Sequence, residues 1–164
     1  MIYVTVGTND QQFNRLVRCV DELKGKGIII EDVIIQTGYS DYIPENCEWK
    51  KLYSHDEMLR NVENARIVIT HGGPSSIILP LRMGKIPIVV PRQKKYGEQV
   101  NDHQVFFSKT VSERYNNIIL VNEIEELKDV LSRYNELAVA KRSEMGENNN
   151  ERFVNAFSKI VDEL

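Results

Sequence analysis

Short apolar runs alternate with amphipathic segments along most of the chain. Each run is four or five residues long and rich in Ile and Val, which is typical of buried strands. The predicted strands cover residues 2–6, 33–36, 49–53, 66–70, 86–90 and 118–121. Between them, apolar residues recur at helical spacing. The predicted helices cover residues 13–23, 55–64, 74–83 and 98–111, followed by two closing helices that carry Ile124 to Tyr134 and Phe153 to Leu164.

This alternation predicts the fold class. Each crossover helix must bury its apolar stripe on the sheet, so the pattern favours a parallel α/β sheet of the Rossmann-like kind with helices on both faces. The polar stretch at residues 141–150 is interpreted as a hinge or loop before the C-terminal helix. At 164 residues the chain fits a single domain, residues 1–164.

Composition and charge narrow the function classes. Hydrophobic residues make 41% and charged residues 27% of the chain, the balance of a globular protein. The net charge of −3 offers no overall attraction to nucleic acid or anionic lipid, so any such contact must be local. Cys19 and Cys47 lack metal-ligand spacing, and the start of the chain resembles neither a signal peptide nor a membrane span. A cytoplasmic chain is expected.

The candidate chemistry lies in three loops that follow predicted strands. Ligands of open α/β sheets bind beyond the carboxyl ends of the strands. The loops cover residues 7–10, 71–76 and 92–101. These loops are therefore expected to form the binding site.

The middle loop is suited to an anion. Gly72 and Gly73 let the backbone approach a ligand, and Pro74 fits the first turn of the helix that follows. Ser75 and Ser76 add hydroxyl donors to a helix N-terminus, where phosphate binds well. A plain helix cap after a tight turn explains the same residues equally well. The spacing matches neither the P-loop nor the dinucleotide fingerprint.

Histidines and basic residues leave further alternatives open. His71 is interpreted either as a ligand contact or as a residue that orients its loop, whereas His55 and His103 have weaker claims. No histidine or carboxylate pair has metal-ligand spacing, so no metal site is predicted. A second group, Arg92, Lys94 and Lys95, is suited to a diphosphate or an anionic lipid headgroup, although such runs are usually solvated surface.

A dense set of hydrogen-bonding side chains follows the basic group. Donors and acceptors of this kind suit sugar hydroxyls, and helix capping explains some of them. They are Glu98, Gln99, Asn101, Asp102 and Gln104. Neither a G-x-S-x-G elbow nor a cysteine at a strand end is present, which disfavours covalent hydrolase chemistry.

Three segments, residues 4–8, 70–76 and 91–104, together resemble the C-terminal, donor-binding domain of the GT-B glycosyltransferases of family 28. The resemblance covers nearly the whole chain. It is greatest to the donor-binding subunits of bacterial two-subunit capsule and exopolysaccharide glycosyltransferases. The chain is also similar to the catalytic subunit of the eukaryotic enzyme that transfers N-acetylglucosamine to a dolichol-linked acceptor.

The resemblance assigns donor-binding roles to residues of all three loops. It implies that the 71–76 loop holds the diphosphate of a UDP-sugar, that the 7–10 loop faces it across a cleft, and that residues from 98 onward line the donor sugar. The residues implied are Gly7, Thr8, His71, Gly72, Gly73, Pro74, Ser75, Ser76, Glu98, Gln99, Asn101, Asp102 and His103, with Gln104 extending the same wall. Relatives commonly hold the ribose through an acidic residue five positions before Gly84, where this chain has Leu79. Glu98 or a partner is then the expected source of the ribose contact.

The resemblance also implies a reaction. A sugar, with galactose preferred, passes with inversion from a UDP-sugar to a polyprenyl-diphosphate-linked acceptor, with no metal or other cofactor. His71 and Asp10 are the candidate catalytic residues, and the partner is the other possible source of the general base. The expected partner is a membrane-anchored acceptor-binding subunit that holds this hexosyltransferase at the inner face of the membrane.

Two other functions compete with this hypothesis. The first is a noncatalytic nucleotide-sugar sensor or accessory subunit, which Leu79 supports. The second is an NAD- or FMN-type domain, which ranks last because the dinucleotide fingerprint is missing.

Overall fold

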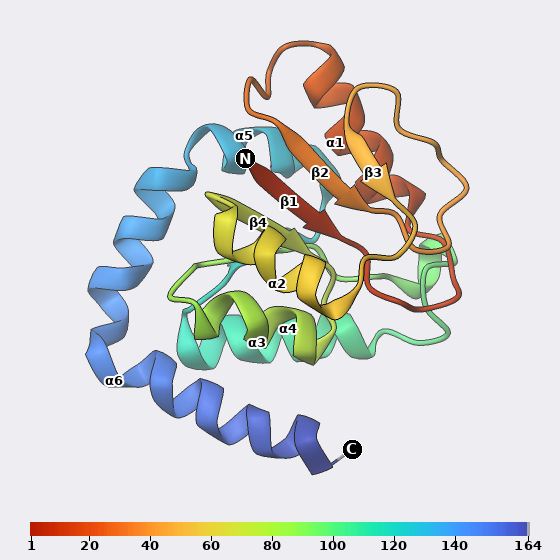
Figure 1. The fold of residues 1–164 in the computed structure, drawn as a ribbon. Coiled ribbons are helices and arrows are strands. Elements are labelled where there is room, and N and C mark those ends of the chain that lie inside the picture. The colour runs from red at the N-terminus through yellow and green to blue at the C-terminus, as the bar shows by residue number, and fades with distance from the viewer. Residues whose placement is uncertain (164) are drawn as a thin grey trace.

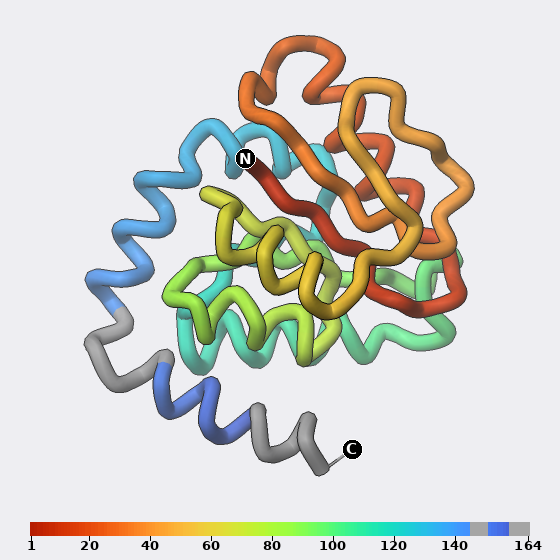
Figure 2. Tube along the Cα trace, in the orientation of Figure 1, coloured from red at the N-terminus to blue at the C-terminus, as the bar shows by residue number. Residues whose placement is uncertain are grey.

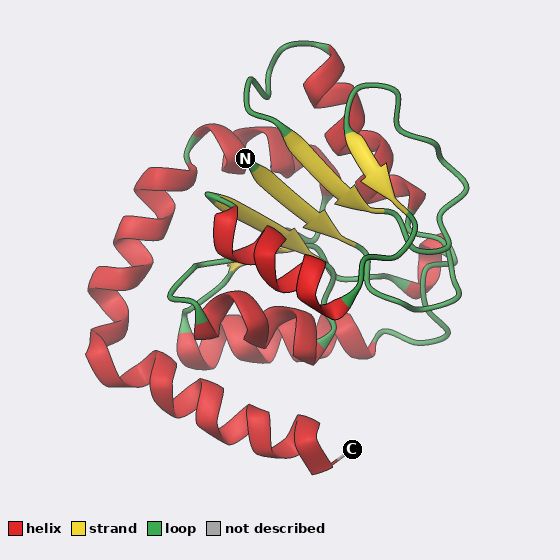
Figure 3. Ribbon diagram, in the orientation of Figure 1, coloured by secondary structure: helices red, strands yellow, loops and turns green. Residues whose placement is uncertain are grey.

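The computed structural model forms one six-stranded parallel sheet covered by helices (Figures 1 and 3). It describes the backbone of residues 1–163 and the side chains of residues 1–144 and 151–157 (Figure 2). The strands are β1 (Ile2–Thr5), β2 (Val33–Gln36), β3 (Glu48–Lys50), β4 (Ile67–Thr70), β5 (Ile88–Val89) and β6 (Ile119–Leu120). The helices are α1 (Asn14–Gly25), α2 (His55–Asn64), α3 (Pro74–Arg82), α4 (His103–Tyr115), α5 (Leu127–Ser132) and α6 (Tyr134–Glu163), with short 3-10 turns η1 (Lys94–Tyr96) and η2 (Ile124–Glu126).

The strand order places a topological switch point at the centre of the sheet. The order is β3-β2-β1-β4-β5-β6, so the chain leaves β1 first toward β2 and later returns to its other side as β4. Thr5, the last residue of β1, pairs with Gln36 on one side and with Thr70 on the other. In open α/β sheets of this order, ligands bind in the crevice beyond these carboxyl ends. The predicted Rossmann-like parallel sheet is confirmed.

In every strand except the exposed β3, alternate residues pack in cores on opposite faces of the sheet. In β1, Ile2 and Val4 pack with α1 and α5, whereas Tyr3 packs with α2 on the other face. Farther along the second face, α3 and α4 share a core with Phe153 of α6. Because both faces are covered, the strands are continuously apolar, and this is why they were recognisable in the sequence.

The predicted elements differ from the structure mainly at their ends. The helix predicted to begin at residue 98 begins at His103, because residues 98–102 remain in a loop. Glu98 accepts a hydrogen bond there from the Gln93 amide, at 3.0 Å. The helices predicted from 55 and from 74 do start at those residues, and α2 starts with a capping box between Ser54 and Glu57.

The loop predicted for residues 141–150 is wrong at its start, because residues 141–144 belong to α6. Phe153 and Phe157 of the predicted C-terminal helix do pack on α4 as an apolar face requires. The rest of the predicted hinge, together with Ile160 and Leu164, lies outside the residues whose side chains are described. None of the helices in the described part of the chain combines the length and apolar character needed to cross a bilayer.

A buried carboxylate ties the long β2–β3 loop to α1. Asp21 is fully buried, and it accepts hydrogen bonds from the Tyr42 hydroxyl at 2.7 Å and from the amides of Glu45 and Asn46. Burial opposes ionisation, but these hydrogen bonds outweigh it and lower the pKa of Asp21. The loop that crosses the outer part of the sheet is therefore fixed to the helix beneath it.

Candidate functional site

The carboxyl ends of β1 and β4 open into a cavity of about 190 Å³ at the switch point. It brings together residues that are far apart in sequence but follow neighbouring strands. Its lining comprises Thr5, Gly7, Thr8, Gln36, Met58, His71, Ser75, Ser76 and Leu79. Five of these, Gly7, Thr8, His71, Ser75 and Ser76, are predicted site residues, so two of the three loops do meet as expected.

His71 is at the centre of a hydrogen-bond network under this cavity. Its Nδ1 accepts from the Gly73 amide at 3.2 Å and lies 3.2 Å from the side-chain nitrogen of Gln104. With Nδ1 accepting, the ring proton belongs on Nε2, which lies 3.1 Å from the Ser76 hydroxyl. The imidazole thus orients its own loop and the first turn of α3.

The surroundings of His71 keep it neutral. Burial, and secondarily the charge of Arg92, lower the pKa of His71 to about 4, although the hydrogen bond with Gln104 opposes this shift. A neutral imidazole whose Nδ1 is already occupied is poorly suited to accept a proton from an acceptor hydroxyl. Its geometry favours the loop-orienting alternative that the sequence left open.

The two glycines of the loop are required by packing. A Cβ on Gly72 would lie 2.7 Å from the Ser108 hydroxyl and 2.8 Å from the Gln104 Cβ, both on α4. A Cβ on Gly73 would collide with the His71 ring. Their amides are also engaged, since Gly72 donates to Gln104 at 2.9 Å and Gly73 donates to His71. Within this loop, His71, Ser75 and Ser76 are the residues that line the cavity.

Helix α3 supplies the electrostatics of the cavity. It begins at Pro74 after an extended Gly73, and no side chain caps its N-terminus. The amides of a first helical turn have no partner within their own helix and carry partial positive charge. With the Ser75 and Ser76 hydroxyls beside them, they form a site for an anionic group.

Gln104 and Arg92 hold the three loops together. The Gln104 side-chain oxygen accepts from the amides of Gly72 and Arg92, so α4 bridges the 71–76 loop and the loop after β5. The Arg92 guanidinium is fully buried and donates to the carbonyl oxygens of Val6, Gln11, Gln12 and Glu98. Burial lowers its pKa to about 10, so it stays charged at neutral pH. The interpretation of Arg92 as an exposed member of the basic run is wrong.

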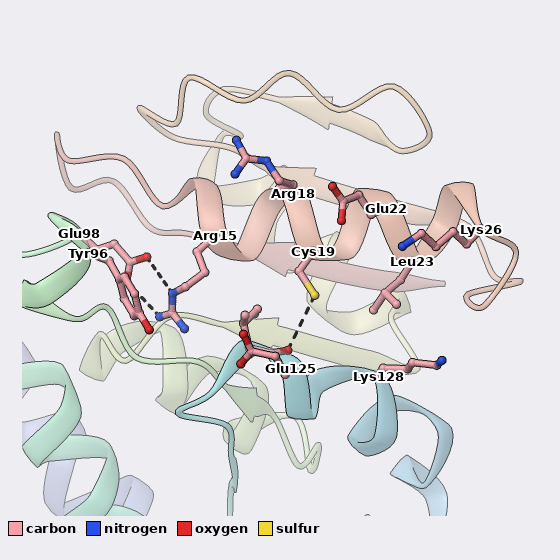
Figure 4. Close-up of a pocket in the computed structure, with 11 residues that line it drawn as sticks. Arg15, Arg18, Cys19, Glu22, Leu23, Lys26, Tyr96, Glu98, Glu125 and Lys128 are labelled. Atoms are coloured by element: carbon pink, nitrogen blue, oxygen red, sulfur yellow. Dashed lines mark hydrogen bonds and ion pairs between the residues drawn. The ribbon is translucent and has the colours of Figure 1, made fainter.

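Glu98 is turned away from the switch-point cavity. Both carboxylate oxygens of Glu98, which is buried, bind Arg15 of α1 at 3.0 Å (Figure 4). They lie at one end of a larger cavity of about 680 Å³ between α1 and the η2–α5 segment. Arg15 also lies over the Tyr96 ring, 4.6 Å from its centroid. The predicted contact of Glu98 with the donor sugar remains a prediction, and in this arrangement its carboxylate is committed to Arg15.

The remaining predicted residues occupy the rim beyond the cavity. Gln99 accepts a hydrogen bond from Asn9 and thereby joins the first and third loops. Asn101 and Asp102 accept from backbone amides, those of His103 and Lys94. The side chains of Asp10 and His103 are exposed. Nothing in this geometry assigns these rim residues a ligand, and their roles remain predictions.

Three residues that shape the cavity were not among the predicted site residues. Gln36 ends β2 and is buried, donating to Thr5 and accepting from the Tyr53 amide. A polar residue ending an apolar strand is the signal that marks it. Met58 and Leu79 form an apolar wall, and nothing in the sequence distinguishes them from core residues. No cluster of metal-ligand side chains occurs among the described residues.

The fold and site together define an open parallel α/β domain whose switch-point cavity adjoins an uncapped helix N-terminus, an arrangement suited to an anionic ligand. Within that class, the family model of the glycosyltransferase family 28 C-terminal domain matches residues 1–164, and the chain belongs to this family.

One curated relative shares 30% identity over 117 residues, the human UDP-N-acetylglucosamine transferase subunit ALG13. The match covers 66% of this chain and 10% of the relative. This chain therefore corresponds to a small part of that protein.

Solved glycosyltransferases share the fold. SnogD from Streptomyces nogalater aligns with a TM-score of 0.56 at 18% identity, over 99% of this chain and 43% of that one. MurG from Acinetobacter baumannii aligns with a TM-score of 0.53 at 16% identity, over 96% of this chain and 49% of that one. These likenesses confirm the GT-B type of fold, and the chain spans less than half of each structure.

Proposed function

We propose that this chain is the donor-binding part of a UDP-sugar-dependent glycosyltransferase, with the diphosphate bound at the N-terminus of α3. The observation that carries the proposal is the convergence of Gly7, Ser75 and Ser76 on one cavity at the switch point. The family membership and the wording of the ALG13 name support a UDP-sugar as the donor.

The charge of the leaving group is the main demand on such a site. As the bond between the anomeric carbon and the diphosphate oxygen breaks, negative charge develops on the diphosphate. Amides of a helix N-terminus and the Ser75 and Ser76 hydroxyls are fixed in place before the reaction, so they stabilise this charge without reorganising. We propose that this preorganised N-terminus carries the role without a metal ion.

The acceptor hydroxyl attacks from the opposite face of the sugar, which inverts the anomeric carbon. Its oxygen bonds to that carbon, UDP departs, and the proton passes to a general base. Asp10 lies exposed in the loop after β1 and is the candidate base within this chain. The partner subunit is the other candidate, because the facing wall of the cleft must come from beyond this domain.

The ribose contact distinguishes this chain from the pattern expected of its family. Leu79 lines the cavity, packs against the core of β1 and β4, and offers no hydrogen bond. Glu98 does not fit the role of the missing acidic residue, because Arg15 binds both of its carboxylate oxygens. We infer that the ribose hydroxyls are bound by the partner.

The partner and acceptor follow from the same reasoning. This chain covers less than half of each solved relative, and the ALG13 name describes a subunit, so both support an acceptor-binding half in a separate partner. We propose a membrane-anchored partner that binds a polyprenyl-diphosphate-linked acceptor of capsule or exopolysaccharide synthesis at the inner face of the membrane. Galactose is the donor sugar expected from the family resemblance, and N-acetylglucosamine is the sugar in the relative's name.

Calorimetry with UDP tests the donor site. The double variant Ser75→Ala/Ser76→Ala removes two hydroxyl contacts and is expected to weaken UDP binding about tenfold or more, at roughly 1 kcal/mol for each hydrogen bond. UMP, which lacks the second phosphate, should be affected much less. Ser132→Ala, on α5, is the matched control and should bind UDP as the unaltered chain does. Equal UDP affinity in all three proteins contradicts the proposal.

The transfer reaction is tested with the chain alone and together with the acceptor-binding subunit, against UDP-galactose and UDP-N-acetylglucosamine. We expect the pair to release UDP and the chain by itself to release none. Full activity of the chain by itself would overturn the two-subunit proposal. Binding of UDP without turnover in the pair favours the second candidate, a noncatalytic nucleotide-sugar sensor or accessory subunit, for which the apolar Leu79 is the supporting observation.

A further inference from the structure

Helix α4 and the loop before it present apolar side chains to solvent. Val100 is 72% and Phe106 is 66% exposed, and Tyr96 in η1 is also exposed. In contrast, α4 buries the polar side chains of Gln104 and Ser108. These two polar residues of its inward face pack on Gly72 and support the site loop, while Val111 and Phe107 of the same helix pack in the core with α3. Val100 and Phe106 belong to none of the hydrophobic cores formed by the described residues.

Three exposed lysines lie in the same segment as these apolar side chains, and Lys95 lies over the Tyr96 ring, 5.0 Å from its centroid. Lys94 and Lys95 are exposed in η1, and Lys109 is exposed one turn beyond Phe106 on α4. Asp102 connects η1 to α4. Its carboxylate accepts a hydrogen bond from the Lys94 amide at 2.9 Å, and its carbonyl accepts one from the Phe106 amide at 3.1 Å. The α4 patch is defined as Lys94, Lys95, Tyr96, Val100, Phe106 and Lys109.

The patch is basic although the chain is acidic overall, with a net charge of −3. Among the acidic residues of the same segment, Glu98 is paired with Arg15, so Asp102 is the carboxylate that stands against the three lysines. A local cationic surface therefore remains. It attracts anionic groups within about 10 Å, the screening distance at moderate salt.

We propose that the α4 patch docks directly on an anionic membrane surface. Aromatic and aliphatic side chains that enter the headgroup region, ringed by lysines that pair with anionic lipids, are the chemistry of interfacial binding. A protein partner fits less well, because lysine is depleted from protein interfaces. Lysine stems also extend along apolar surface while the ammonium groups reach the headgroups.

The position of the patch suits a lipid-linked acceptor. It adjoins Gln99, on the side of the site where the donor sugar is proposed to lie. If the proposed function holds, a membrane at this surface brings a lipid-linked diphosphate to that end of the cleft. Membrane binding itself goes beyond that function, because it is measurable with no nucleotide present.

Co-sedimentation with vesicles tests the proposal. The unaltered chain is expected to bind vesicles of equal parts phosphatidylcholine and phosphatidylglycerol, to leave phosphatidylcholine vesicles unbound, and to dissociate at high salt. Each lysine near an anionic surface contributes about fivefold in affinity, so Lys94→Glu/Lys95→Glu should bind at least tenfold more weakly. Phe106→Ser should also bind at least fivefold more weakly through loss of its buried ring.

Matched controls separate the patch from general charge and hydrophobicity. Lys26→Glu/Lys128→Glu makes the same charge change beside the cavity between α1 and α5, and Ile30→Ser removes an exposed apolar side chain before β2. Both should bind vesicles as the unaltered chain does, and thermal melting checks that every variant is folded.

Three results would overturn the proposal: no binding by the unaltered chain, equal losses in the controls, or patch variants that retain vesicle binding but no longer join the acceptor-binding subunit. The last result would identify the patch as a protein interface. UDP calorimetry on the same variants keeps the two proposals apart. Vesicle binding by an unaltered chain that binds no UDP would count against the donor site alone.

Discussion

At the scale of single residues, His71 shows how one buried side chain organises a loop. Its two ring nitrogens connect the Gly73 amide, Gln104 and the Ser76 hydroxyl, and the glycines beside it leave room for the ring. Burial keeps the ring neutral. The loop geometry that faces the cavity therefore depends on an uncharged His71.

This dependence predicts a pH effect on stability. In the unfolded chain His71 binds a proton near pH 6.5, whereas in the folded chain its pKa is about 4. Between these values the unfolded state holds more protons, so stability falls as pH decreases from 6.5 toward 4, by about 3 kcal/mol from this residue. His71→Asn, which can still accept from the Gly73 amide, should remove that part of the fall.

Denaturant unfolding at several pH values measures the effect. The other carboxyl and histidine groups titrate in both proteins, so the difference between the two stability curves isolates His71. His55→Asn, at the exposed start of α2, is the control and should follow the unaltered chain. Parallel curves for His71→Asn and the unaltered chain would show that His71 is protonated in the folded protein as readily as in the unfolded one.

At the scale of elements, the loop between β5 and α4 is fixed by buried charges. Arg92 reaches back to the carbonyls after β1, and Glu98 reaches across to Arg15 of α1. These two contacts connect segments about 80 residues apart in sequence. They position Gln99 and the start of α4 beside the cavity.

The variant Glu98→Gln distinguishes a structural role from a donor-sugar role. It leaves Arg15 without its carboxylate partner, and removal of one member of a buried pair costs roughly 3 kcal/mol or more of folding free energy. The expected result is a clear loss of stability in denaturant unfolding. Glu125→Gln, on the rim of the same cavity, should leave stability unchanged. Unchanged stability together with a raised KM for one UDP-sugar would instead assign Glu98 to the donor sugar.

Sequence patterns predicted the elements well where both burial and capping are local. Val33–Gln36 and the start of α2 were predicted at the residues where they occur, and α3 starts at Pro74, one of the two predicted positions, Pro74 or Ser75, because the apolar runs and Pro74 lie within the segments themselves. The early start predicted for α4 failed because Glu98 is held by Arg15, a contact that no local pattern records. The loop predicted from residue 141 failed because polar composition does not by itself end a helix.

At the scale of the whole molecule, the fold explains why the site occurs where it does. Chain order alone places the 7–10 and 71–76 loops on adjacent strands, since the direction of strand addition reverses between β1 and β4. The sequence allowed the general position of the site to be predicted from this rule. It did not reveal the ion pair of Glu98 with Arg15 or the buried hydrogen bonds of Arg92, because their partners lie on other elements.

In the proposed function, this domain forms one wall of a cleft. It spans less than half of each solved glycosyltransferase to which it is similar, and its switch-point cavity is open to whatever faces it. We expect the acceptor and the ribose contact to come from that facing side, and the diphosphate contact to come from this chain.

A crystal structure of the chain with UDP tests this division most directly. The account predicts that the diphosphate lies at the N-terminus of α3, within hydrogen-bond distance of Ser75 and Ser76 and beside the loop that begins at Gly7. UDP seated instead in the cavity between α1 and α5, or with its phosphates away from α3, would contradict the central claim.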